Sequence, residues 1–92
     1  MKFQLHTQHF NATEQLVAYI DKKVEKLNKY SDIIAAELTL KVVKPESAKN
    51  KEANLHLALS GRKLHFEKVA DTFEEAIDAV VDMARRELNE SK

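Results

Sequence analysis

Residues 53–69 of the chain read ANLHLALSGRKLHFEKV, and they carry the clearest structural pattern of the sequence. Apolar residues recur at every second position on both sides of Gly61, the one glycine of the sequence. Such an alternation is typical of strands that bury one face. A glycine between two strands favours a tight hairpin turn, because it adopts the positive φ that these turns require. The stretch therefore predicts two antiparallel strands, and their buried face would hold Leu55, Leu57, Leu59, Leu64 and Phe66.

Two earlier segments alternate in the same way and predict two more strands. Over residues 2–9 one face would carry Phe3, Leu5, Thr7 and His9, and the other Lys2, Gln4, His6 and Gln8. Over residues 36–42 the buried face would carry Ala36, Leu38, Leu40 and Val42. Pro45 closes this strand because proline cannot donate a hydrogen bond to a sheet. Residues 45–51 are predicted to form a polar loop.

Two further segments have helical periodicity. The first is predicted to run to about Tyr30, with Leu16, Ile20, Val24 and Leu27 on its buried stripe. Asn11 with Glu14 matches a capping box, and Thr13 is a competing cap. The second helix would bury Phe73, Ile77, Val80, Ala84 and Leu88, and its cap is either Asp71 with Glu74 or Thr72 with Glu75. Its acidic first turn and its two late arginines suit the helix dipole.

The predicted order is β-α-β-β-β-α, which makes this an α+β chain forming a single domain over residues 1–92. Each predicted element has one apolar face. These faces are most simply buried together if both helices pack on one face of a four-stranded mixed sheet. The first two strands should be parallel neighbours, because a right-handed helical crossover joins them. The remaining strands should follow in antiparallel order.

Composition narrows the classes of function. Apolar residues make up 43% and charged residues 33%, with no cysteine and a net charge of zero. Residues 1–51 hold nine lysines and six acids, whereas residues 52–92 hold six basic and nine acidic residues. No apolar run suits a membrane span, and the alternating N-terminus does not resemble a signal peptide, so we expect a cytoplasmic protein without a membrane partner.

A stripe of lysines is the clearest candidate for a binding surface. Lys22, Lys26 and Lys29 follow one another at helical spacing, almost opposite the buried stripe of the first helix, so they should face solvent. Such a stripe can neutralise phosphates of a nucleic acid backbone without reading its sequence. A lysine-rich helix face opposite a core face is usually just a solvated surface, so the pattern alone does not establish RNA binding.

The residues of both helices resemble a known family, the short ribosome hibernation-promoting factors, also called ribosome-associated inhibitors or sigma-54 modulation proteins. The resemblance runs over nearly the whole chain and is carried by Thr13-Glu14, Lys22-Lys23, Lys26-Leu27, Tyr30, Ala76-Ile77-Asp78, Asp82, Arg86 and Leu88. It implies a β-α-β-β-β-α fold that binds the small ribosomal subunit, occupies the channel of messenger and transfer RNA, and performs no catalysis.

The resemblance implies that the side chains in contact with ribosomal RNA phosphates are Lys22, Lys23, Lys26, Lys29 and Arg86. We add Arg85 because it is a basic residue next to Arg86. The second helix departs from the family pattern, because Met83 and Glu90 stand where lysine is common. Asp82 is also spaced to form surface ion pairs with Arg85 and Arg86, which would compete with RNA.

Other chemistries find little support in the sequence. His6, His56 and His65 could share the open face of the sheet, but no cysteine or short histidine spacing supports a metal site, and no cofactor is expected. His9 would be a hydrogen-bonded residue at the edge of the core. With the phenylalanines directed inward, no aromatic platform for base stacking is expected on that face.

No nucleotide-binding or catalytic motif is present, so we do not expect an enzyme or a small-molecule substrate. We expect a monomer. The alternative function, from a different class, is a non-enzymatic protein-interaction module that uses the exposed face or an edge of the sheet.

Overall fold

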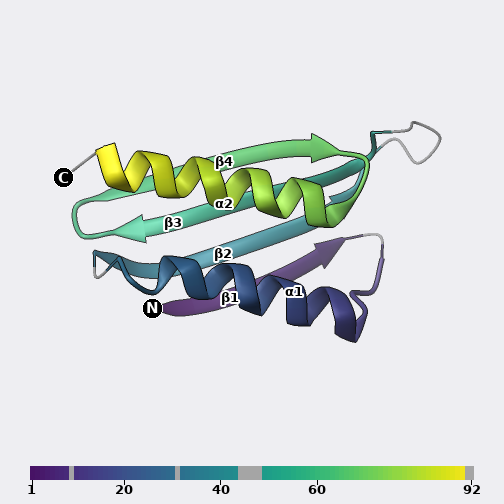
Figure 1. Cartoon of the computed structure of the whole chain (residues 1–92), viewed down its shortest axis with the longest axis horizontal. Helices are drawn as coiled ribbons and strands as arrows, with labels where there is room; N and C mark the ends of the chain where they lie inside the picture. Colours follow the sequence, from purple (N-terminus) through teal and green to yellow (C-terminus); the bar gives the residue numbers. More distant parts are fainter. Residues whose placement is uncertain (9, 31, 44–48, 91–92) are drawn as a thin grey trace.

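The computed structural model of the protein describes residues 1–8, 10–30, 32–43 and 49–90. Its elements follow the predicted β-α-β-β-β-α order of an α+β fold (Figure 1). They are β1 (Lys2–Gln8), α1 (Glu14–Val24), the short 3-10 helix η1 (Glu25–Leu27), β2 (Ile33–Val42), β3 (Lys51–Leu59), β4 (Arg62–Ala70) and α2 (Phe73–Glu90).

The four strands form one mixed sheet in the order β1-β2-β3-β4. β1 and β2 are parallel, with Leu5 opposite Leu38, while β2–β3 and β3–β4 are antiparallel. The prediction of one parallel pair followed by an antiparallel meander is therefore confirmed. Gly61 turns the β3–β4 hairpin with a φ of 87°, the left-handed conformation that only glycine adopts without strain.

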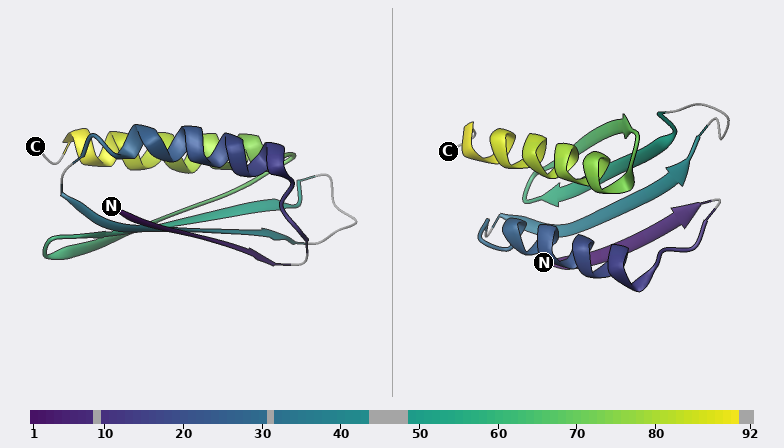
Figure 2. Two further views of the ribbon diagram at one scale, coloured as in Figure 1. Left: turned by 90° about the horizontal axis from the view of Figure 1, so that it is seen from below. Right: turned by 45° about the vertical axis from the view of Figure 1, so that its right-hand side comes forward.

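Both helices cover the same face of the sheet, and the other face is left open (Figure 2). The core lies between the two layers and contains the predicted stripes of both helices. Its fully buried large side chains are Ile20, Leu27, Leu38, Leu40, Leu55, Leu57, Ile77 and Val80. Alternation along the strands thus directs leucines inward and leaves polar residues on the open face.

The ends of the helices correct two details of the prediction. α1 ends at Val24 and tightens into η1, rather than continuing as an α-helix to about Tyr30. Hydrogen bonds of the tighter turn, such as Tyr30 N to Leu27 O at 3.1 Å, satisfy carbonyls that the helix end leaves unpaired. The cap of α1 is Thr13 and not Asn11, because Thr13 Oγ1 accepts from Leu16 N at 3.1 Å. At α2 the Oγ1 of Thr72 accepts from Glu75 N at 3.1 Å.

The strand limits also differ from the prediction. β2 begins at Ile33 rather than at residue 36, because a bulge between Ile33 and Ala35 interrupts the alternation. β3 begins at Lys51, two residues before the predicted start. His9 and residues 45–48 of the predicted loop lie outside the described residues.

Candidate nucleic-acid interface

The predicted lysine stripe lies on the outer surface of the helical layer. Lys22 belongs to the last turn of α1, Lys26 to η1 and Lys29 to the turn that follows, and all three are exposed. None of the three forms an ion pair with a carboxylate of the described residues. Lys29 Nζ lies 5.5 Å from the centre of the Tyr30 ring. The stripe therefore offers solvated ammonium groups that form no ion pair within the described residues.

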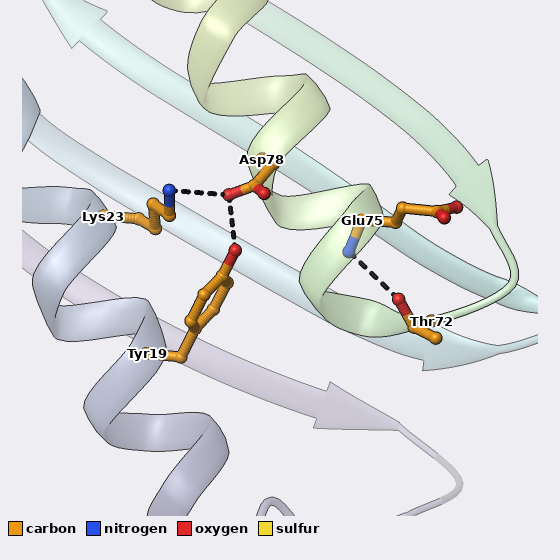
Figure 3. Close-up of polar contacts among 5 residues, drawn as sticks. All are labelled: Tyr19, Lys23, Thr72, Glu75 and Asp78. Atoms are coloured by element: carbon orange, nitrogen blue, oxygen red, sulfur yellow. Dashed lines mark hydrogen bonds and ion pairs between the residues drawn. The ribbon is translucent and has the colours of Figure 1, made fainter.

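Lys23 lies on the flank of α1 that faces α2, and its surroundings are different. Its Nζ is 3.0 Å from Asp78 Oδ1, and the hydroxyl of Tyr19 donates to the same oxygen at 2.7 Å (Figure 3). Lys23 Nζ also lies 5.3 Å from the centre of the Tyr19 ring. The three side chains connect α1 to α2, so Lys23 is already neutralised in part by the protein itself.

The contacts of this cluster shift the pKa values of Tyr19, Lys23 and Asp78. Burial raises the pKa of Asp78, but the Tyr19 hydroxyl and the Lys23 ammonium outweigh burial and hold it below its usual value. The hydrogen bond to Asp78 is the main cause of the raised pKa of Lys23. Burial, followed by the bond to Asp78, raises the pKa of Tyr19. At neutral pH the carboxylate is charged and the phenol is protonated.

Three cations of the helical layer lie close enough to influence one another. Figure 1 shows that α1 and α2 run in the same direction, so their C-terminal ends lie at the same side of the sheet. The ammonium of Lys23, and to a smaller extent the guanidinium of Arg85, lower the pKa of Lys26. The structure thus brings Lys23, Lys26 and Arg85 together, although they come from different elements.

The two arginines of α2 differ in exposure. Arg85 is half-buried, and its Nε is buried without a hydrogen-bond partner among the described residues. Arg86 is exposed. The predicted pairing of Asp82 with these arginines is not formed in the described part of the chain. Near the end of α2, the Tyr30 hydroxyl donates to Asn89 Oδ1 at 3.0 Å, which joins the turn after η1 to α2.

The three histidines predicted to share the open face do lie there, and all are exposed. His56 and His65 stack on each other, whereas His6 lies 3.4 Å from Glu37 on the neighbouring strand β2. Within residues 1–8, 10–30, 32–43 and 49–90, no three side chains of metal-ligating type come together. Among these residues there is also no helix with the length and apolar character of a membrane span.

Sequence reasoning missed Tyr19 and Asp78 as parts of the interface. The signal was present in the spacing, because Tyr19 and Lys23 are four residues apart on one flank of α1. Asp78 and Arg85 are likewise seven residues apart on one flank of α2. Only the placement of the helices side by side makes the two flanks meet.

Comparison with known proteins shows which fold and which family the chain shares. The chain is similar to the crystallised N-terminal domain of Protein Y from Thermus thermophilus, with a TM-score of 0.84 and 22% sequence identity. The match covers 100% of both chains. A ribosomal subunit interface protein from Coxiella burnetii matches 99% of the chain over 97% of its own length, with a TM-score of 0.83 and 17% identity. At such identities the likeness shows a common fold. Residues 3–92 match the family described as sigma 54 modulation protein / S30EA ribosomal protein, and the chain belongs to that family.

Proposed function

We propose that the protein is a cytoplasmic ribosome hibernation factor that binds ribosomal RNA of the small subunit. In this proposal Lys22, Lys26 and Lys29 hold phosphates together with Arg85 and Arg86, and Lys23 contributes less because Asp78 already pairs with it. The folded body occupies the channel of messenger and transfer RNA and stops translation by steric exclusion. This mechanism needs no bond chemistry and no cofactor, and it requires only one copy of a single domain.

The observation that carries the proposal is the convergence of cations in the helical layer. Lys23 and Arg85 repel the Lys26 ammonium in the folded protein, and this repulsion lowers the pKa of Lys26. A polyanion relieves such repulsion, because each phosphate that contacts an ammonium lowers the local positive potential and releases a condensed counter-ion. The charge arrangement is therefore suited to a phosphate backbone, and membership of a ribosome-associated family supports ribosomal RNA as the source of that backbone.

Co-sedimentation with purified small subunits on sucrose gradients, at low and at moderate salt, tests the proposal. A triple variant with Lys22→Ala, Lys26→Ala and Lys29→Ala should bind at least about tenfold more weakly. Its affinity should also depend less on salt, since each lost phosphate contact removes about 0.7–0.9 from the slope of log affinity against log salt.

A matched control separates the site from net charge. The triple variant Lys2→Ala, Lys63→Ala and Lys68→Ala removes the same charge from exposed positions on strands β1 and β4. It should retain most of the affinity for small subunits. Equal loss in both triple variants would show attraction by total charge alone, and binding that is insensitive to salt would favour the protein-interaction alternative. Either result would overturn the proposed interface.

A further inference from the structure

The open face of the sheet is arranged in rows that cross all four strands. The register places Lys2, Ala35, Ala58 and Lys63 in one row, from β1 to β4. The next row holds Gln4, Glu37, His56 and His65. The first row thus has two alanines on the central strands and one lysine on each edge strand. With neighbouring strands about 4.8 Å apart, the Cα atoms of the two lysines are roughly 14 Å apart.

A hollow of about 440 Å³ lies over these two rows. Its floor is formed at Ala35 and Ala58, whose side chains end at Cβ, and Glu37 and His56 line it in the next row. The volume is within the range of small-molecule sites, which begins at about 300 Å³. Lys2 and Lys63 line the same hollow, are exposed, and form no ion pair among the described residues.

The wall of the hollow contains a stack of two aromatic rings. The rings of His56 and His65 are 4.2 Å apart with only 4° between their planes. The amide oxygen of Asn54 accepts a hydrogen bond from His65 Nε2 at 2.9 Å, and Asn54 in turn donates to Glu52 at 2.9 Å. Because the two histidines are cross-strand partners, the free face of the His56 ring is directed across the sheet toward β2.

Space for a planar ligand remains beside that free face. Glu37 is the cross-strand neighbour of His56 on β2, but its Oε2 lies 3.4 Å from His6 Nε2 on β1. The carboxylate therefore leans toward β1 and away from His56. Its side chain is 46% exposed, so the carboxylate can still accept hydrogen bonds from a ligand.

From this arrangement we infer that the open face binds a free purine mononucleotide, with guanine preferred. The base stacks on His56 and extends the histidine stack, and the Glu37 carboxylate accepts hydrogen bonds from its edge. The ribose lies over Ala35 and Ala58, and the phosphate is held by Lys2 and Lys63. Guanine is favoured because its edge presents two adjacent N–H donors to a carboxylate, whereas adenine presents one amino group.

The inference adds a ligand site to the protein, on the face of the sheet opposite the helices. The sequence predicted no stacking platform there because its phenylalanines are directed inward. The platform consists of two imidazoles that stack only because β3 and β4 place them opposite each other. Base stacking on an aromatic side chain contributes about 1–3 kcal/mol, which corresponds to at least about a fivefold gain in affinity.

Titration of the full chain with GMP, followed by amide and imidazole NMR shifts, tests the inference. Saturable shifts should appear at the hollow and not on the helices. AMP should bind at least about threefold more weakly, and guanosine or ribose 5-phosphate alone at least about tenfold more weakly, because each lacks part of the recognition. His56→Ala should reduce GMP affinity about fivefold or more.

Matched variants keep the test specific. Ala58→Ile fills the hollow with a residue that suits a strand, so it should abolish GMP binding while the protein stays folded. Lys63→Ala should weaken binding about threefold or more, whereas Lys68→Ala, on the same strand but on the opposite phase of its alternation, should not. The Lys22, Lys26 and Lys29 triple variant should bind GMP normally, which separates this site from the proposed ribosomal interface.

Three results would overturn the inference. One is the absence of saturable shifts with GMP. Another is an unchanged affinity in Ala58→Ile or His56→Ala while the fold is retained. The third is self-association that buries the hollow, detected by sedimentation velocity, since a second copy and not a nucleotide would then be its occupant.

Discussion

The two helices lie side by side on one face of the sheet, but their cations are in different surroundings. Residues 14–30 carry four lysines and three carboxylates, whereas α2 carries two arginines and six carboxylates. Lys22, Lys26 and Lys29 are exposed, while Arg85 is half-buried. Exposure and neighbouring carboxylates, rather than the mere presence of basic residues, therefore distinguish the two helices as surfaces for a polyanion. We therefore expect α1 and the turn after it to contribute most of the affinity.

The largest expected effect on small-subunit binding comes from reversing the charge of one cation in η1 and of one cation in α2. Lys26→Glu should weaken small-subunit binding about tenfold, and Arg86→Glu about threefold, because α2 already repels phosphate. Lys26→Glu should not lower the temperature of unfolding, since it removes repulsion from Lys23 and Arg85. Gradient co-sedimentation and thermal unfolding check both variants. An equal or larger effect of Arg86→Glu would contradict the assignment of the main role to α1.

The next effect concerns the contact that holds the helices together. Tyr19→Phe should lower the free energy of unfolding by about 1 kcal/mol, because Asp78 loses a hydrogen bond to a charged group. The matched control is Tyr30→Phe, which removes a hydroxyl that donates to the neutral, exposed Asn89 and should cost roughly half as much. Urea unfolding measures both. A larger cost for Tyr30→Phe would show that the Asp78 cluster is not the stronger link.

A smaller and opposite effect on binding is expected from the carboxylate itself. Asp78→Asn releases Lys23 from its ion pair and leaves the neighbouring cations without this counter-ion. Affinity for small subunits should rise about threefold, and the salt slope should become steeper by about 0.7–0.9. Asp82→Asn makes the same charge change without breaking an ion pair of the described residues. Asp82→Asn should raise the affinity for small subunits less than Asp78→Asn does. Equal gains in affinity would mean that the total charge of the protein alone governs binding.

The smallest effect is on stability at acid pH. Because the folded protein lowers the pKa of Asp78 below its ordinary 3.8, this carboxylate stabilises the fold above that pH. The stabilisation is lost as the pH falls through the folded pKa. The side chain is 44% exposed, so solvent screening limits the contribution to a few tenths of a kcal/mol. The difference in unfolding free energy between the wild type and Asp78→Asn should therefore shrink on acidification, and a growing difference would contradict this account.

Much of the fold follows from local patterns in the sequence. Leu55, Leu57 and Leu59 are buried because strand alternation directs them to one side, and Gly61 turns the hairpin because it accepts a positive φ. The errors lie at the ends of elements. Ile34 was missed as part of β2 because a bulge breaks the alternation there, leaving this residue 59% exposed.

The candidate site was predictable to a smaller degree. Helical spacing correctly predicted that Lys22, Lys26 and Lys29 face solvent, because exposure opposite a buried stripe is a local property. It did not predict that Lys23 is paired with Asp78, or that Asp82 leaves the arginines unpaired in the described part of the chain. Which partner a charged side chain finds depends on the rotation and offset of two separate helices.

The order of the elements, their buried faces and the exposed lysine stripe follow from local sequence patterns, since periodicity and turn chemistry act over a few residues. The contacts between elements depend on how the whole chain packs. Tyr19 meets Asp78 across 59 positions of sequence, and the rings of His56 and His65 stack because strand register sets them opposite each other. Packing of the whole core fixes these placements, and no local pattern encodes the relative offset of two elements.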